Sequence, residues 1–216
     1  MPAEIFFITG TNTEVGKTYI TTHLLKEYKK QNKVAIALKP IASGAEYIDN
    51  QLVNEDALLI KEYNSLNLDY KEINPFTFKE AIAPHIAAKN INKELNINRL
   101  VNTISDTISV YKDKTDYILI EGAGGFLTPI NYKNTYAEVV KKLSEKFSIK
   151  IILVVNIKLG CINHSMLTSD YLINNNYNFY GWVANNYDKN NLVLLENIKT
   201  IEKFLKAPLL FNVPRL

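Results

Sequence analysis

The sequence has a single cysteine, Cys161, among its 216 residues, so it cannot form an intramolecular disulfide. Proteins without disulfides suit a reducing compartment. The first four residues also lack the basic segment with which a signal peptide begins, and they lead directly into a strand-like run. We therefore expect a cytoplasmic protein.

Arginine and dense positive charge are scarce as well. The chain contains only Arg99 and Arg215, and its net charge is +3 with 22% charged residues. Proteins that bind a nucleic-acid backbone usually carry a dense basic stripe, and membrane-surface helices are basic and amphipathic. Apolar runs such as Ile151–Val155 are too short to span a bilayer. We expect neither nucleic acid nor a membrane as a partner.

What the chain does contain is a regular alternation of short apolar runs and helical patterns. Continuous apolar runs predict strands covered on both faces, at Ile5–Thr9, Val34–Lys39, Tyr117–Glu121, Ile151–Asn156, Tyr180–Asn185 and Leu209–Val213. Helical spacing predicts helices at Lys17–Gln31, Glu55–Tyr63, Ile97–Tyr111, Ala137–Phe147, Ile162–Asn175 and Leu192–Leu205. Strands separated by helices favour a three-layer α/β fold with a mainly parallel central sheet and helices on both faces.

The length suits one domain, residues 1–216, with a sizeable core. Residues 65–93 are the least regular part, because Pro75 and Pro84 interrupt any pattern there. We expect an irregular excursion with a short helix. In open parallel sheets, ligands bind beyond the carboxyl ends of the strands. The residues that directly follow each strand are therefore the candidates for function.

The first strand is followed by Gly10-Thr11-Asn12-Thr13-Glu14-Val15-Gly16-Lys17-Thr18 and then by a helix. This strand–loop–helix arrangement is typical of a loop that cradles nucleotide phosphates. Lys17 can reach the β and γ phosphates, and the Thr18 hydroxyl can bind Mg²⁺. The spacing is unusual, because Thr11 stands at the usual position of the first glycine and Gly10 lies one residue earlier.

Other strand ends carry polar residues whose roles stay open at this point. Glu121, followed by the glycine-rich run 122–125, suits either a Mg²⁺ ligand or a solvated turn. Lys39 places a cation on the ligand side of the sheet, or is simply a solvated strand end. Asp56 is typical of an acidic residue in a first helical turn. Asn185 suits either a turn or pairing with the edge of adenine.

Gly160 precedes a predicted helix, and a helix N-terminus is a favourable place for a carboxylate. Cys161 beside it is typical of a small packing residue, because the sequence gives it no base partner. No His/Cys group has the spacing of a metal site.

Taken together, these segments resemble the dethiobiotin synthetase family. The resemblance rests on the segments 10–18, 39–44, 54–57, 74–76, 83–85, 121–125, 158–164 and 181–185, which follow one another in the family's order. It spans nearly the whole chain and implies a P-loop fold. It also implies a reaction that takes 7,8-diaminopelargonate, CO₂ and Mg-ATP to dethiobiotin, ADP and phosphate. The reaction passes through a carbamate and a mixed carbamic-phosphoric anhydride.

The resemblance also implies roles for individual residues. Lys39 and Lys17 would be catalytic, and Mg²⁺ would be bound by Thr18, Asp56 and Glu121. The nucleotide would contact Thr13, Glu14, Val15, Gly16, Lys17, Thr18, Tyr19, Asp56, Glu121, Gly122, Ala123, Gly124, Asn185, Val213, Pro214 and Arg215. The substrate would contact Ser43, Thr13, Gly160, Cys161, Ile162 and Asn163.

The family is dimeric, so the resemblance implies a homodimer. In that dimer the loop from Gly160 to Asn163 reaches the substrate carboxylate in the neighbouring subunit. Two alternatives are considered. An amide-forming P-loop ligase would need a glutamine-hydrolysing domain, for which this chain has no room. A ParA/MinD-like ATPase carries an additional signature lysine early in the loop, where this chain has Asn12.

Overall fold

A six-stranded sheet forms the centre of the molecule in the computed structural model, which describes residues 2–186 and 193–214. The strand order is β10-β9-β8-β1-β7-β2, and each of its pairings is parallel. The strands are β1 (Glu4–Gly10), β2 (Ala35–Leu38), β7 (Tyr117–Gly125), β8 (Ile149–Asn156), β9 (Phe179–Asn186) and β10 (Leu209–Pro214). The predicted parallel sheet is confirmed, and β7 continues four residues beyond the predicted end at Glu121.

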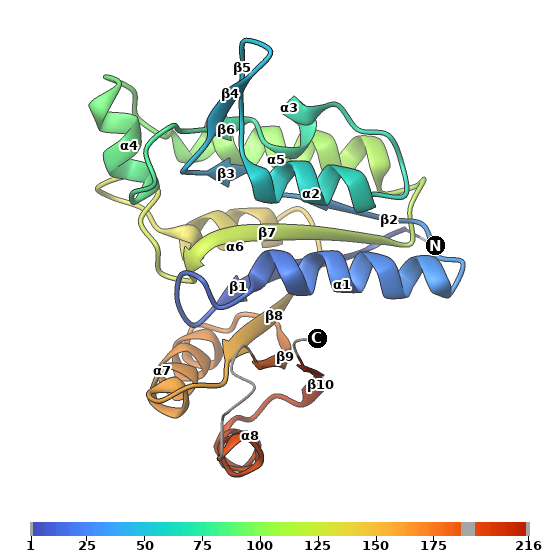
Figure 1. Ribbon diagram of the computed structural model, residues 1–216, viewed down its shortest axis with the longest axis vertical. Coiled ribbons are helices and arrows are strands. Elements are labelled where there is room, and N and C mark those ends of the chain that lie inside the picture. Colours follow the sequence, from blue (N-terminus) through green and yellow to red (C-terminus); the bar gives the residue numbers. More distant parts are fainter. Residues whose placement is uncertain (1, 187–192, 215–216) are drawn as a thin grey trace.

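Helices cover the sheet on both sides (Figure 1). They are α1 (Lys17–Lys30), α2 (Glu55–Tyr63), α5 (Ile97–Tyr111), α6 (Tyr136–Ser144), α7 (Cys161–Asn174) and α8 (Leu194–Phe204). Helices α1 and α2 lie together in front of β1, β7 and β2, while α5 and α6 lie behind them. The three predicted layers are therefore present. Residue 192, where we expected the last helix to begin, lies outside the described residues.

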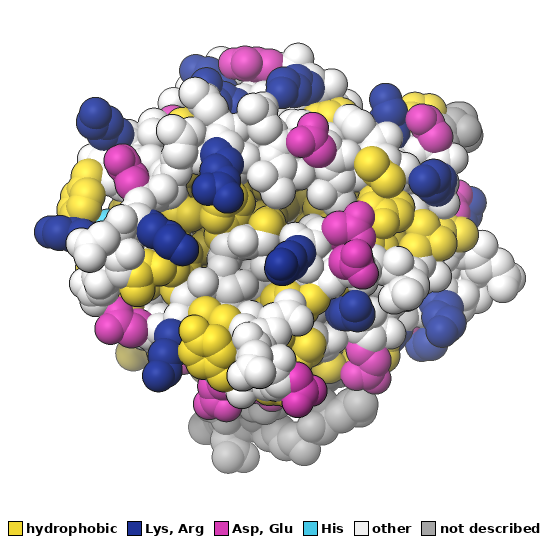
Figure 2. All heavy atoms as spheres, turned by 90° about the horizontal axis from the view of Figure 1, so that it is seen from above, with side chains coloured by type: hydrophobic (Ala, Val, Ile, Leu, Met, Phe, Trp, Pro, Cys, Tyr) yellow, Lys and Arg dark blue, Asp and Glu magenta, His cyan; other side chains and the backbone are white. Residues whose placement is uncertain are grey.

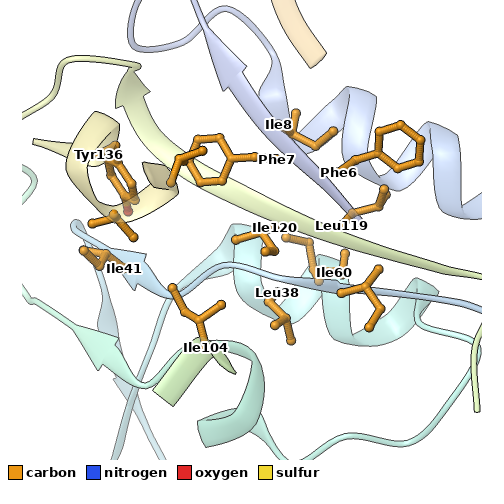
Figure 3. Close-up of a cluster of buried hydrophobic side chains, with 14 of the residues drawn as sticks. Phe6, Phe7, Ile8, Leu38, Ile41, Ile60, Ile104, Leu119, Ile120 and Tyr136 are labelled. Carbon is orange, nitrogen blue, oxygen red and sulfur yellow. The ribbon is translucent and has the colours of Figure 1, made fainter. Parts of the chain in front are cut away.

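The core follows from the alternation of side chains along each buried strand. On β1, Phe7 points toward α6, where its ring lies 5.7 Å from the ring of Tyr136, whereas Phe6 and Ile8 point to the other face (Figure 3). Both faces of β1 are buried, so four of its seven residues can be large and apolar. Strands of this kind have continuous apolar sequences because no face meets water.

The segment between β2 and α5 contains more structure than the sequence indicated. Residues 46–53 form a hairpin of β4 (Glu46–Ile48) and β5 (Gln51–Val53) that stands off the sheet. Asp49 and Asn50 at its tip both have positive φ, as two-residue hairpin turns require. Residues 65–93 contain two helices, α3 (Tyr70–Ile73) and α4 (Pro84–Asn90), so our prediction of one short helix there was wrong.

Strand pairing holds this excursion close to the end of β2. The strands β3 (Ile41–Ala42) and β6 (Phe76–Thr77) form a small parallel sheet, which fixes residues 76–77 beside the chain that leaves β2. Figure 2 looks down on this side of the molecule and shows Lys and Arg side chains interspersed with Asp and Glu. No helix in the described ranges is long and apolar enough to cross a membrane.

The order of the strands locates the ligand edge of the sheet. From β1 the chain crosses through α1 to β2 on one side, and from β7 it crosses through α6 to β8 on the other side. The carboxyl ends of these neighbouring strands therefore border a point where the winding reverses. Ligands of open parallel sheets bind at such a point.

Candidate active site

The loop between β1 and α1 has the backbone conformation of a phosphate-binding loop. Gly16 precedes the helix with φ 89°, and no side chain caps the first turn. The N–H groups of that turn are thus available to an anion, and the helix dipole adds to the attraction. Glu14 also has a positive φ, 57°, which is rare for a residue with a side chain. The local structure therefore supports the predicted phosphate site.

The early position of the first glycine has a steric explanation. A Cβ at Gly10 would lie 2.4 Å from Cγ2 of Val15 and 3.0 Å from the carbonyl oxygen of Asn12. Val15 is buried, so the loop folds back on the end of β1 and leaves no space for a side chain there. Glycine is needed at this point although the usual spacing places it one residue later.

Lys17 lies in the loop rather than in solvent. Its ammonium donates a hydrogen bond of 3.3 Å to the carbonyl oxygen of Asn12, and the residue is only 7% exposed. Burial lowers the pKa of Lys17 to about 8. A buried ammonium with few anionic neighbours is a strong partner for phosphate, because an incoming phosphate supplies the charge that the site lacks.

A second cluster lies where β2, β7, α1 and α2 meet. The Lys39 ammonium is 2.6 Å from Oε1 of Glu121 and 2.6 Å from Oδ2 of Asp56, and it lies 3.4 Å from the Thr18 hydroxyl. The Thr18 hydroxyl donates to Oε1 of Glu121 at 2.6 Å. Residues separated by up to 103 positions in the sequence are thereby brought together around one point.

Burial strengthens the electrostatic interactions between the charged groups of this cluster. Glu121 has no exposed surface, and the Lys39 side chain is 8% exposed, whereas the Asp56 side chain is 47% exposed. Burial alone would lower the pKa of Lys39, but the carboxylates of Glu121 and Asp56 outweigh it and raise that pKa. Lys39 therefore stays protonated, and the cluster opens to solvent on the side of Asp56.

Thr21 is a site residue that the sequence analysis missed. Its hydroxyl donates to Oε2 of Glu121 at 2.8 Å and is also 2.9 Å from the carbonyl oxygen of Lys17. Thr21 is fully buried, so it fixes the second oxygen of the carboxylate. Helical spacing could have indicated it, because Thr21 follows Lys17 by four positions and lies on the same face of α1.

The oxygen donors of this cluster fit a magnesium ion. Thr18, Asp56 and Glu121 direct a hydroxyl and two carboxylates toward the point that Lys39 shares with them. Hard oxygen donors of this kind suit Mg²⁺, which usually keeps water and phosphate oxygens as its other ligands. Among the described residues, no group of three or more His, Cys, Asp or Glu side chains could hold a metal. A cation here would thus need the hydroxyl and further oxygens from outside the protein.

The glycines at the end of β7 are explained by packing within the protein itself. A Cβ at Gly122 would lie 2.9 Å from the ring of Phe7, and one at Gly124 would lie 2.3 Å from the hydroxyl of Thr128. Gly124 also has a positive φ of 68°. These glycines let β7 pass closely over the core beside the phosphate loop, and Ala123 lies between them in the strand.

Asn185 supports the phosphate loop from the end of β9. Its side-chain nitrogen donates to the carbonyl oxygen of Val15 at 2.8 Å. Its side-chain oxygen is buried and has no hydrogen-bond partner among the described residues. Val213 of β10 pairs with Asn185 in register, and Pro214 follows in the same strand. Arg215, the remaining residue expected near the adenine, lies outside the described residues.

The other expected site residues lie farther from the cluster. Cys161 is buried in a hydrophobic cluster of β8, β9, α7 and α8, and burial raises the pKa of its thiol. Gly160 precedes α7 with φ 89° and no side-chain cap, while Ile162 is half-buried and Asn163 exposed. Among the described residues, no hydrogen bond connects that segment to Lys17 or Lys39. The single chain therefore assembles the phosphate loop and the cation cluster, and leaves this segment apart.

Three further expected residues border the loop and the excursion. Thr13 is exposed, and its N–H donates to the side chain of Asn12 at 2.7 Å. Tyr19 is half-buried against the core behind the loop. The Ser43 hydroxyl is buried and has no hydrogen-bond partner in the described part of the chain.

Comparison with known proteins identifies close relatives. A family model described as an AAA domain matches residues 4–216. The ATP-dependent dethiobiotin synthetase BioD of Wigglesworthia glossinidia brevipalpis is 41% identical over 97% of this chain and 89% of that protein. The protein of the same name from Legionella pneumophila (strain Paris) is 40% identical over 95% of this chain and 91% of its own length.

Solved structures share the fold at much lower identity. The MinD cell division protein of Aquifex aeolicus superimposes with a TM-score of 0.59 at 17% identity, covering 99% of this chain and 83% of that one. A ParA family ATPase from Chlorobium tepidum TLS gives a TM-score of 0.56 at 13% identity, covering 100% and 85%. These likenesses show the fold alone, so the ParA/MinD alternative gains no functional support from them. Since relatives of about two-fifths identity match almost the whole chain, it belongs to the ATP-dependent dethiobiotin synthetase family.

Proposed function

We propose that this protein closes the ureido ring of dethiobiotin from 7,8-diaminopelargonate, CO₂ and ATP. The observation that carries the proposal is the buried Lys39 ammonium, held 2.6 Å from both Glu121 and Asp56 beside a phosphate loop that carries Lys17. The reaction must bring two anions together, a triphosphate and a carbamate. Two preorganised cations at the same edge of the sheet suit that task.

The reaction has three steps. One amine of the substrate adds to CO₂ and loses a proton, which gives a carbamate. A carbamate oxygen attacks the γ-phosphorus of ATP and expels ADP, which gives a mixed anhydride. The second amine then attacks the carbamate carbon, expels phosphate and loses a proton as the ring closes. Transfer of the phosphoryl group concentrates negative charge, so stabilisation by cations matters most in the second step.

Lys17 and Lys39 divide this stabilisation. Lys17 faces the phosphate loop, where it neutralises the β and γ phosphates. Lys39 follows β2, and its ammonium lies 3.4 Å from the hydroxyl of Thr18, the residue next to Lys17. It stabilises the transferring phosphoryl group and the attacking carbamate oxygen. Mg²⁺, when bound through Thr18, Asp56 and Glu121, neutralises phosphate charge and orients the triphosphate.

The two ends of the ligands extend away from this centre. Asn185 and Val213 border the adenine, supported by the unpaired buried oxygen of Asn185 and its pairing with β10. Ser43 contacts the substrate, supported by its unpaired buried hydroxyl. These assignments follow the family's pattern.

The substrate carboxylate is bound by a second subunit. The uncapped start of α7 at Gly160 suits an anion, and no hydrogen bond among the described residues joins it to the Lys39 cluster of its own chain. Exposed apolar side chains offer surface for association, among them Ile82, Ile86 and Leu159. A homodimer that exchanges the segment from Gly160 to Asn163 would complete each site.

The direct test of the function is a product assay. Purified protein supplied with diaminopelargonate, bicarbonate, Mg²⁺ and ATP should form dethiobiotin, ADP and phosphate in equal amounts. Omission of the diamine should abolish phosphate release above background. Steady ATP hydrolysis that ignores the diamine and yields no dethiobiotin would overturn the proposed function.

Replacing Lys39 should separate nucleotide binding from catalysis. In Lys39→Met the phosphate loop is intact, so Mg-ATP should still bind, whereas kcat should fall by about 10²–10³ because a preorganised cation is missing. Without Mg²⁺, Glu121 would be left buried and unpaired, and the free energy of unfolding should fall by about 3 kcal/mol. Isothermal titration, turnover assays and urea unfolding measure the three effects. Wild-type turnover in this variant would show that Lys39 has no catalytic role.

The lowered pKa of Lys17 predicts proton uptake on nucleotide binding. Phosphate favours the ammonium, so binding raises the pKa above its free value of about 8. Affinity should therefore be highest below that value and decline as pH rises through the pKa of the complex. At about pH 9 binding should take up close to one proton, and much less at about pH 7.

Titration calorimetry in buffers of different ionisation enthalpy measures this uptake. Lys17→Arg is the matched control, because arginine keeps its charge at all these pH values. It should bind nucleotide without the extra proton. Equal uptake by both proteins at high pH would mean that another group titrates.

A shared active site predicts recovery of activity on mixing two inactive variants. Lys39→Met and Asn163→Asp should each be weak, the second because its charge repels the substrate carboxylate. In a heterodimer of the two, one site carries both lesions and the other carries neither. After complete exchange of equal amounts, activity should approach about a quarter of the wild-type value. Differently tagged subunits verify exchange, and verified heterodimers without recovered activity would exclude the shared site.

A further inference from the structure

The backbone that carries Lys39 is held by the excursion after β5. The strand β2 ends at Leu38, and beyond it the Lys39 N–H donates to the carbonyl oxygen of Ile73 at 2.9 Å. The side-chain nitrogen of Asn74 donates to the carbonyl oxygen of Lys39 at 2.6 Å. One residue later, the N–H of Phe76 donates to Pro40 at 3.1 Å. Residues 73–76 therefore fix both polar groups of the Lys39 backbone.

The helix that carries Asp56 is fixed by Asn54. The side-chain oxygen of Asn54 caps α2 by accepting from the N–H of Ala57 at 3.3 Å. Its side-chain nitrogen donates to the carbonyl oxygen of Ser43 at 3.1 Å. Asn54 thus ties the start of α2, two residues before Asp56, to the chain that follows Lys39.

Tyr70 joins these two anchors. Its hydroxyl accepts a hydrogen bond of 2.8 Å from the N–H of Asn54 and donates one of 2.8 Å to the side-chain oxygen of Asn74. The hydroxyl of Thr77 donates to that same oxygen at 2.8 Å. Tyr70, Asn74 and Asn54 are at most 9% exposed, so water does not compete for these bonds. Burial also raises the pKa of Tyr70, which keeps its proton in place.

We propose that Tyr70 and Asn74 are positioning residues for the reaction, because they link the Lys39 backbone to the start of α2 and so set where Lys39 meets Asp56 and Glu121. The proposal rests on the proposed function and adds residues that act through Lys39 and Asp56. Neither residue carries charge, and neither needs to touch a substrate.

The physical reason lies in the length and freedom of the lysine side chain. Its ammonium must reach Glu121 and Asp56 at 2.6 Å each, so an error in the position of the backbone moves the cation directly. Lys39 and Asp56 come from separate elements, the end of β2 and the start of α2. No strand pairing joins these two elements. A fully paired buried network is rigid, and an error of about 1 Å at a reacting group can lower a rate by about 100-fold.

Tyr70→Phe is the direct test, because it removes only the hydroxyl that joins the two anchors. The N–H of Asn54 would lose its acceptor, and the side-chain oxygen of Asn74 would accept only from the hydroxyl of Thr77. We expect kcat to fall by about tenfold or more, while the Kd for nucleotide changes by less than about twofold because the phosphate loop is untouched. Thr77→Val, which removes one donor to Asn74, should lower kcat in the same direction by a smaller factor.

Tyr177→Phe is the matched control. The Tyr177 hydroxyl also donates to a buried part of the backbone, the carbonyl oxygen of Ala137 at 2.9 Å, but it belongs to the loop between α7 and β9. Its loss should reduce thermal stability without lowering kcat. If Tyr70→Phe changed kcat no more than Tyr177→Phe does, the positioning role would be overturned. If Tyr70→Phe did not fold, the kcat of Thr77→Val would be compared with that of Tyr177→Phe instead. A kcat lowered no more than in Tyr177→Phe would overturn the positioning role.

A second readout does not depend on the reaction. The Lys39 ammonium is buried and hydrogen-bonded, so its ¹H–¹⁵N signal should be observable and can be assigned by its absence in Lys39→Met. Tyr70→Phe should shift or broaden that signal, and Tyr177→Phe should leave it unchanged. An unchanged signal in Tyr70→Phe would contradict the positioning role whatever the substrate. Absence of dethiobiotin from the wild-type protein would contradict only the proposed function.

Discussion

The buried charge of Glu121 is the constraint around which the site is built. A carboxylate without exposed surface costs several kcal/mol unless its lost hydration is replaced. Here the hydroxyls of Thr18 and Thr21 and the ammonium of Lys39 replace it, each within 2.8 Å of a carboxylate oxygen. Because Glu121 ends the apolar part of β7, its demand for a cation and for donors fixes how α1 and β2 meet that strand.

The same constraint gives the site its chemical character. Glu121 and Asp56 raise the pKa of Lys39, which keeps a cation where the proposed phosphoryl transfer requires one. Lys17 is in the opposite situation, because burial outweighs the attraction of Glu121 and Asp56 and lowers its pKa to about 8, so a bound phosphate would supply the missing counter-charge. One lysine is thus satisfied by the protein and the other by the ligand. This difference agrees with the proposed roles of Lys17 in nucleotide binding and of Lys39 in catalysis.

Much of this arrangement could be predicted from the sequence. The six apolar runs predicted the central strands because both faces of each are buried. Lys39 follows β2 directly, Glu121 ends the apolar part of β7, and Thr18 lies in the first turn of the helix after the phosphate loop, so the three meet at the carboxyl edge of the sheet. Asp56 could not be distinguished from an ordinary acidic residue in a first helical turn; only the family resemblance singled it out. The segment between β2 and α5 was poorly predicted, since its strands have two or three residues each and depend on tertiary contacts. For the same reason, nothing in the pattern indicated that Tyr70 connects Asn54 to Asn74.

The most direct test of the account is a crystal structure with Mg²⁺, a non-hydrolysable ATP analogue and diaminopelargonate. The account predicts the metal bound to Thr18, Asp56 and Glu121, directly or through one water, in the region where those groups now meet Lys39. It also predicts that the Lys39 ammonium turns from Asp56 toward the γ-phosphate and the reacting amine. A metal bound away from both carboxylates, with Lys39 still paired to them and remote from the phosphates, would contradict it.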